Sequence, residues 1–148
     1  KKKEKKTKRN RKDNMRFLVV DDELTNRKLL TTMLEDAGYC DVAVNGQEAV
    51  ECFRMTLDGE QAYDVIFLDI KMPVMDGHEA LKQIRALEEK KGIFVGDGVK
   101  IVMVTALGDK KNILEAFHEG CEYYLVKPFQ QKKILELLNE MDLLKLEE

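Results

Sequence analysis

The chain alternates short apolar runs with longer stretches in which apolar residues recur every three or four positions. Short continuous apolar runs are typical of strands buried on both faces, and the wider spacing is typical of amphipathic helices. Strands are predicted at residues 17–20, 39–44, 65–68, 101–104 and 123–126. The first, third and fourth are the most apolar, which suits central positions, whereas the half-polar second strand suits a sheet edge.

A helical pattern follows each predicted strand, with apolar stripes over residues 29–37, 49–57, 80–87, 113–117 and 134–141. Strand and helix alternate five times, which predicts an α/β fold with a parallel sheet covered by helices on both faces. In such open sheets, ligands bind at the carboxyl ends of the strands. The residues that directly follow the strands are therefore the candidates for chemistry.

Charge divides the 148 residues into two parts. Residues 1–16 hold ten of the 25 Lys and Arg residues but two of the 28 acidic residues, so an acidic body follows a basic head. We predict a mobile basic tail or linker over residues 1–14 and one domain over residues 15–148, and we do not expect nucleic acid as a partner. No apolar run is long enough to span a membrane and no signal peptide is visible, so we expect a cytoplasmic protein.

Acidic, hydroxyl and ammonium side chains follow four of the predicted strands. Asp21 and Asp22 follow the first strand, Asp69 follows the third, Thr105 the fourth and Lys127 the fifth. In a parallel sheet these groups converge at one edge, where neighbouring carboxylates repel one another unless a cation intervenes. Mg²⁺ prefers oxygen ligands and is usually held by one or two carboxylates plus a phosphate. The pattern therefore predicts a magnesium site at this edge.

The same groups suit phosphoryl transfer, in which catalysis rests mainly on positioning and charge neutralisation. Asp69 stands alone after a central strand and is the candidate nucleophile, which would become an acyl phosphate. Mg²⁺ would take one phosphoryl oxygen, Thr105 with the backbone amide of Ala106 would take another, and Lys127 would take the third.

Four motifs make the chain resemble the receiver (phosphoacceptor) domains of two-component response regulators, of the CheY-like superfamily. They are Val-Val-Asp-Asp-Glu at residues 19–23, Phe-Leu-Asp-Ile-Lys-Met-Pro-Val-Met-Asp-Gly at 67–77, Val-Thr-Ala at 104–106 and Tyr-Leu-Val-Lys-Pro-Phe at 124–129. The resemblance covers about residues 15–142. It implies a doubly wound, flavodoxin-like sheet of five parallel strands in the order 2-1-3-4-5, with five helices.

The resemblance implies a role for each acidic residue. Asp69 would accept a phosphoryl group from a phosphohistidine on a histidine kinase or a histidine phosphotransfer protein. Asp22 and Asp69 would ligate Mg²⁺ (or Mn²⁺) directly, and Asp21 would act mainly through water. The backbone carbonyl of Lys71 would be a further protein ligand.

The resemblance also implies a conformational switch. Thr105 and Lys127 would bind phosphoryl oxygens, Tyr124 would turn inward as Thr105 moves, and the bond between Lys127 and Pro128 would be cis. The surface of the fourth helix, fifth strand and fifth helix would change as a result, and this face could carry a homodimer contact. The chain would then be a phosphoacceptor switch that assists its own phosphorylation and dephosphorylation, and not an enzyme with an external substrate.

Two other functions use part of this pattern. A phosphatase of the haloacid dehalogenase type also has a nucleophilic Asp, but it needs a second Asp two residues later, where Lys71 stands. A pseudo-receiver, which is an interaction module without phosphorylation, would not need the full set of Asp69, Thr105 and Lys127. Both remain alternatives to the receiver hypothesis.

Other features are assigned structural roles. Asp76 is predicted to cap the third helix, and His78 and His118 are interpreted as surface residues. The long connection over residues 90–99 is interpreted as a surface insertion, in which residues 93–95 could pack as a small flap. The domain could be a single-domain regulator or the receiver of a larger protein such as a hybrid histidine kinase.

The acyl phosphate on Asp69 is predicted to be long-lived. Lys71 and Leu107, two residues after Asp69 and Thr105, offer no acid or carboxamide to orient an attacking water. We expect Leu107→Glu to accelerate loss of the phosphoryl group in a measurement of phosphoprotein decay. An unchanged rate would contradict this explanation.

Overall fold

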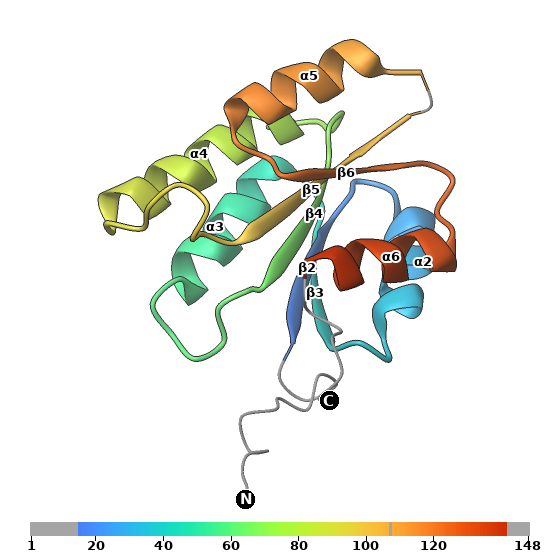
Figure 1. Cartoon of the computed structure of the whole chain (residues 1–148), viewed down its shortest axis with the longest axis horizontal. Helices are drawn as coiled ribbons and strands as arrows, with labels where there is room; N and C mark the ends of the chain where they lie inside the picture. Colours follow the sequence, from blue (N-terminus) through green and yellow to red (C-terminus); the bar gives the residue numbers. More distant parts are fainter. Residues whose placement is uncertain (1–14, 107, 142–148) are drawn as a thin grey trace, which may run out of the picture.

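The computed structural model describes residues 15–106 and 108–141 (Figure 1). The predicted basic tail at residues 1–14 and the position of Leu107 lie outside this part of the chain. Among the helices described, none has the length and apolar character needed to cross a membrane.

The strands form one parallel sheet in the order β3-β2-β4-β5-β6. This confirms the predicted order 2-1-3-4-5. The strands are β2 (Arg16–Val20), β3 (Tyr39–Ala43), β4 (Val65–Asp69), β5 (Lys100–Thr105) and β6 (Tyr123–Val126). The helices that follow them are α2 (Leu24–Leu34), α3 (Gly46–Thr56), α4 (Gly77–Lys90), α5 (Lys110–Glu119) and α6 (Gln131–Glu140).

Helices cover both faces of the sheet, with α3, α4 and α5 on one face and α2 and α6 on the other (Figure 1). Because successive side chains of a strand point to opposite faces, each central strand contributes to two separate cores. In β4, Ile66 and Leu68 pack under α3 and α4, whereas Val65 and Phe67 pack under α2 and α6. The apolar runs of the sequence are explained by this burial on both sides.

The three most apolar strands, β2, β4 and β5, are the three central strands, as predicted. All five residues of β4 are buried. In the edge strand β3 only Ala43 is buried, and the full or partial exposure of the other positions, Asp41 among them, agrees with its half-polar sequence. Asp69 therefore ends the strand that is enclosed most completely.

Local signals set the ends of several helices. The side chain of Asn45 accepts a hydrogen bond from the backbone amide of Glu48 and begins α3, and Asp76 does the same for Glu79 and begins α4. The predicted cap at Asp76 is thus confirmed. Gly120 ends α5 in a left-handed conformation, with φ of 115°, which glycine adopts without a steric penalty.

The connection between α4 and β5 does not contain the predicted apolar flap. Phe94 and Val95 are exposed instead of packed, with 78% and 104% of their surface accessible. The connection is tied down by a buried acid, because Glu88 accepts a hydrogen bond from the backbone amide of Val99 at 2.7 Å and pairs with Arg85 at 2.6 Å. The connection is therefore held by the polar contacts of Glu88 and not by the apolar packing that the sequence predicts.

Gly77, the first residue of α4, lies against the last residue of β4. Its amide donates to the carbonyl of Ile70 at 2.8 Å, and an added Cβ would collide with the backbone carbonyl of Asp69. We expect Gly77→Ala to lower the free energy of unfolding by about 1–3 kcal/mol, the usual cost of overpacking, in denaturant titration. Gly59→Ala is the matched control, because its Cβ would have no contact closer than 3.8 Å. Equal effects of the two substitutions would contradict the close approach.

Candidate functional site

The carboxyl ends of the four strands β2, β4, β5 and β6 meet at one edge of the sheet. Asp69 is the last residue of β4 and lies beside Val104 of β5. Thr105 ends β5 and lies beside Val126, so that Lys127 follows at the same level. Parallel pairing alone therefore brings together side chains that are far apart in the sequence.

Three carboxylates gather at this edge. Asp21, Asp22 and Asp69 each place an oxygen within 4.8 Å of the others. Asp21 and Asp69 are buried, with 3% and 7% of their surface accessible, and Asp22 is exposed. Asp21 also accepts a hydrogen bond from the backbone amide of Glu23 at 2.9 Å. One oxygen of Asp21 thus orders the start of α2, while the other faces the cluster.

The ammonium of Lys127 bridges two of the carboxylates. Its Nζ lies 3.4 Å from Oδ2 of Asp21 and 3.4 Å from Oδ1 of Asp69. The backbone amide of Lys127 donates to the carbonyl of Thr105 at 2.9 Å, and the bond to Pro128 is cis. The lysine is therefore held at both its backbone and its charged end.

One ammonium does not balance three carboxylates, and the pKa values reflect this. Burial, followed by the charge of Asp21, raises the pKa of Asp69 from its usual 3.8 to about 6, although Lys127 opposes the shift. Burial tends to lower the pKa of Lys127, but the charges of Asp69 and Asp21 outweigh it and the pKa is raised. Excess negative charge on clustered oxygens is what a divalent cation such as Mg²⁺ neutralises, so the donor set fits that ion.

The other predicted site residues differ in their burial and contacts. Thr105 is buried, and its hydroxyl donates to the carbonyl of Ala106 at 3.3 Å rather than to the acids. Tyr124 is 47% exposed and packs edge-on against Phe117, with ring centroids 6.1 Å apart. The side chain of Lys71 is exposed. The structure thus groups the acids with Lys127 and leaves Tyr124 turned outward.

Sequence reasoning missed the environment of one residue. His78 was interpreted as a surface residue, but its side chain is only 12% exposed and bonds to Glu119 and Asn112 of α5. No local signal could have shown this, because the partners lie 41 and 34 residues away in the sequence. His118 is exposed, as predicted.

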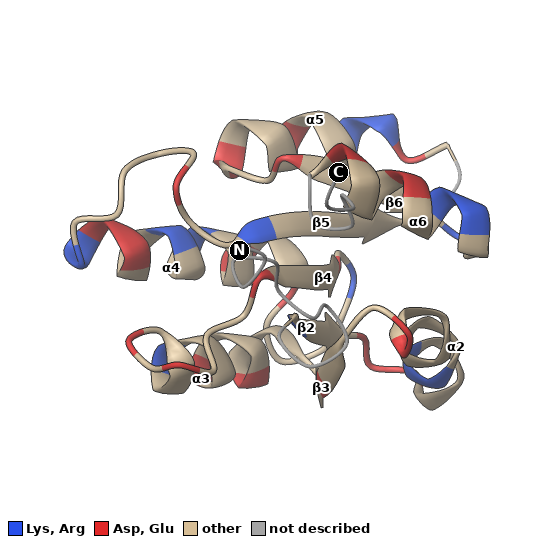
Figure 2. Ribbon diagram, turned by 60° about the horizontal axis from the view of Figure 1, so that its bottom comes forward, with Lys and Arg blue, Asp and Glu red and all other residues tan. Residues whose placement is uncertain are grey.

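Basic residues lie on the same side of the molecule as the carboxyl ends of the strands (Figure 2). Helices α5 and α6 have lysines in their first turns, on the side of the molecule toward which the strands point (Figure 2). These residues are Lys110, Lys111, Lys132 and Lys133. Cations are unfavourable at the start of a helix, so their position there is not explained by helix stability.

Comparison with known proteins identifies relatives for most of the chain. The family model described as "Response regulator receiver domain" matches residues 17–139. The chemotaxis protein CheY of Thermotoga maritima is 34% identical over 128 residues, which cover 85% of this chain and 96% of CheY.

Several solved structures of similar shape are receiver domains. The receiver domain of Ssk1 from Saccharomyces cerevisiae, crystallised with the histidine phosphotransfer protein Ypd1, has a TM-score of 0.77 and 31% identity, covering 89% of this chain and 93% of that one. The receiver domain of the sensor histidine kinase PA1611 from Pseudomonas aeruginosa, with magnesium in its active-site cleft, has a TM-score of 0.72 and 26% identity, covering 86% and 97%.

The raised pKa of Asp69 predicts a pH-dependent effect of its removal. A carboxyl whose pKa is higher in the folded state stabilises the fold below its unfolded pKa, and this contribution is lost as the pH rises through about 6. In the presence of a metal chelator, the free energy of unfolding of Asp69→Asn should therefore exceed that of the wild type by about 1–3 kcal/mol at pH 7.5. The difference should vanish near pH 4. Denaturant titrations at the two pH values test this, and a variant less stable at pH 7.5 would contradict it.

Proposed function

The chain belongs to the response regulator receiver domain family and is a receiver of two-component signal transduction, and on this premise we propose that Asp69 accepts the phosphoryl group. The donor would be a phosphohistidine, and the reaction would depend on Mg²⁺. The observation that carries this proposal is the convergence of Asp69 with Asp21, Asp22 and Lys127 at the carboxyl ends of the strands.

The proposed reaction transfers one phosphoryl group between two proteins. A carboxylate oxygen of Asp69 attacks phosphorus, and an O–P bond forms while the P–N bond to the donor histidine breaks. The imidazole leaves with the electron pair of that bond and takes up a proton. Lys127, already 3.4 Å from Asp69, moves its charge toward the phosphoryl oxygens and offsets the negative charge that arrives with them.

Mg²⁺, or Mn²⁺ in its place, would be held by Asp22 and Asp69 directly, by Asp21 largely through water and by the backbone carbonyl of Lys71. The cation would supply charge neutralisation between the carboxylates and the incoming phosphoryl group. The raised pKa of Asp69 supports this assignment, because burial first and the charge of Asp21 second make its ionised form unfavourable without a counterion. Magnesium in the active-site cleft of the PA1611 receiver domain supports it independently.

The switch would begin at Thr105. Its hydroxyl, which now donates to the carbonyl of Ala106, would turn to a phosphoryl oxygen, and the backbone amide of Ala106 would bind beside it. The space that Thr105 leaves would admit the ring of Tyr124, which now lies outside against Phe117. Phosphorylation would thus shift the population between two arrangements of α5, β6 and α6.

Partners are proposed from the surface around the site. A histidine kinase or a histidine phosphotransfer protein would approach the acidic edge. The crystal structure of the Ssk1 receiver domain together with Ypd1 supports a partner of this kind. The reaction would take place in the cytoplasm. The face of α5, β6 and α6 would form a homodimer contact, because it exposes several large apolar side chains: Leu114, Phe117, Tyr124 and Leu135. Nucleic acid is not expected at the acidic cluster.

Phosphorylation at Asp69 can be measured directly. Incubation with acetyl phosphate and Mg²⁺ should add the mass of one phosphoryl group to the intact chain, and chelation should prevent the addition. Asp69→Asn should abolish it. Asp76→Asn is the matched control, because Asp76 lies outside the cluster and Asn also caps helices. Incorporation that persists in Asp69→Asn would contradict the assignment.

A further inference from the structure

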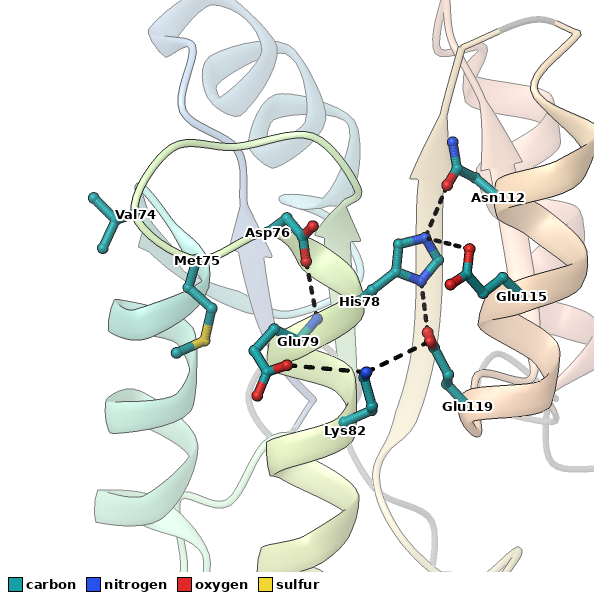
Figure 3. Close-up of a pocket in the computed structure, with 9 residues that line it drawn as sticks. All are labelled: Val74, Met75, Asp76, His78, Glu79, Lys82, Asn112, Glu115 and Glu119. Carbon is teal, nitrogen blue, oxygen red and sulfur yellow. Dashed lines mark hydrogen bonds and ion pairs between the residues drawn. The ribbon is translucent and has the colours of Figure 1, made fainter.

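A second group of potential ligands lies between α4 and α5, away from the strand ends. His78 projects from the first turn of α4 toward α5, where Asn112, Glu115 and Glu119 point back at its ring (Figure 3). These residues line an open pocket of about 550 Å³. None of them has a part in the proposed phosphoryl transfer.

Both nitrogens of the His78 ring have acceptors. Nδ1 lies 2.5 Å from Oε1 of Glu119, and Nε2 lies 3.0 Å from Oδ1 of Asn112. The amide nitrogen of Asn112 donates to both oxygens of Asp109 at 2.8 Å, which leaves its oxygen turned toward the ring. Each ring nitrogen therefore faces an oxygen atom, and Nε2 is turned toward Asn112 and Glu115 (Figure 3).

The electrostatic surroundings of the ring are negative. Burial tends to lower the pKa of His78, but its hydrogen bonds to Glu119 and Asn112 and the charges of Glu119 and Glu115 outweigh this effect, so the pKa is raised. Lys82 of α4 is the nearest compensating cation, with Nζ 3.9 Å from Oε2 of Glu119 and equally far from Oε1 of Glu79. The cluster therefore attracts positive charge to the side of the ring on which Nε2 lies.

We propose that His78 and Glu115, with Glu119 behind the histidine, form a binding site for a divalent transition-metal ion such as Zn²⁺, distinct from the acidic cluster at the strand ends. The three side chains each offer an atom within 4.8 Å of the others. Nε2 of His78 lies 3.9 Å from Oε1 of Glu115. Two ligand atoms at about 2.0–2.1 Å from tetrahedral Zn²⁺ stand roughly 3.4 Å apart, so a small movement of the half-exposed Glu115 closes the site.

The two glutamates have different parts in this site. Glu115 would ligate the ion together with Nε2 of His78. Glu119 would keep its hydrogen bond to Nδ1 and hold the ring in orientation, which is the usual arrangement of a carboxylate behind a metal-bound histidine. The amide oxygen of Asn112 and water would complete the coordination. Binding requires Nε2 without a proton, so the ion and a proton would compete for this atom.

The chemistry of the two clusters separates their ions. An imidazole ligand favours Zn²⁺ and its neighbours among the transition metals. Mg²⁺ prefers oxygen ligands in an octahedral arrangement and keeps its water. Excess Mg²⁺ should therefore occupy the acidic edge without filling the site at His78, which allows the two to be studied separately.

The test is a calorimetric titration of the chain with Zn²⁺ in excess Mg²⁺. We expect His78→Gln and Glu115→Gln each to weaken binding at least tenfold relative to the wild type. The matched control is His118→Gln, which removes the only other histidine of the chain. His118 lies on α5, as Glu115 does, and its substitution should leave the affinity unchanged. Equal affinity in His78→Gln and the wild type, or no binding to the wild type, would overturn the proposal.

A spectroscopic measurement guards against binding by thiols and against misfolding. Burial raises the pKa of all three cysteines, that of Cys40 to about 11, that of Cys121 to about 12 and that of Cys52 as well, so none is readily a thiolate. With Co²⁺ as the probe, we expect ligand-field absorption without a thiolate charge-transfer band, and its loss in Glu115→Gln. A thiolate band would overturn the assignment. Mass gain with acetyl phosphate shows that each variant is folded.

Discussion

The buried carboxylate of Asp69 is the constraint on which the site depends. All of β4 is buried, so its last side chain has little freedom to move away from the other acids. Burial, followed by repulsion from Asp21, raises the pKa of Asp69 to about 6, and Lys127 offsets only part of this effect. A cluster with uncompensated negative charge favours the binding of a cation, and the cation in turn favours a phosphoryl group. A magnesium-dependent phosphoryl acceptor requires such a cluster.

Short backbone contacts keep the groups of the site in register. The amide of Lys127 bonds to the carbonyl of Thr105, and the amide of Ile70 bonds to the carbonyl of Val104. Gly77 approaches the backbone of Asp69 so closely that a side chain does not fit. The neighbouring Val74, with φ of 70°, adopts a left-handed conformation that costs a β-branched residue energy, which is a strain that often accompanies functional loops. The loop after β4 is therefore constrained at both of its ends.

The sequence predicted the features that depend on local pattern. Apolar runs identified the central strands, and the residue after each strand identified the acids and Lys127, because parallel pairing places these ends at one edge. Strand order followed from family resemblance rather than from the pattern. The sequence could not show the pairing of His78 with α5 or the role of Glu88, since these polar contacts join distant segments and depend on how two helices face each other.

The cluster at His78 lies partly on α5, a helix that the switch would move. Helix α5 begins five residues after Thr105, and it carries Glu115 and Glu119, which face His78 on α4. An ion at His78 would hold α5 against α4, whereas phosphorylation at Asp69 would favour another position of the loop that leads into α5. If the ion binds these two arrangements with different affinity, phosphorylation changes the affinity for the ion by at most the ratio of the two affinities, and a bound ion biases the switch in return. The contact between α4 and α5 is thus the place where a second signal could act on the receiver.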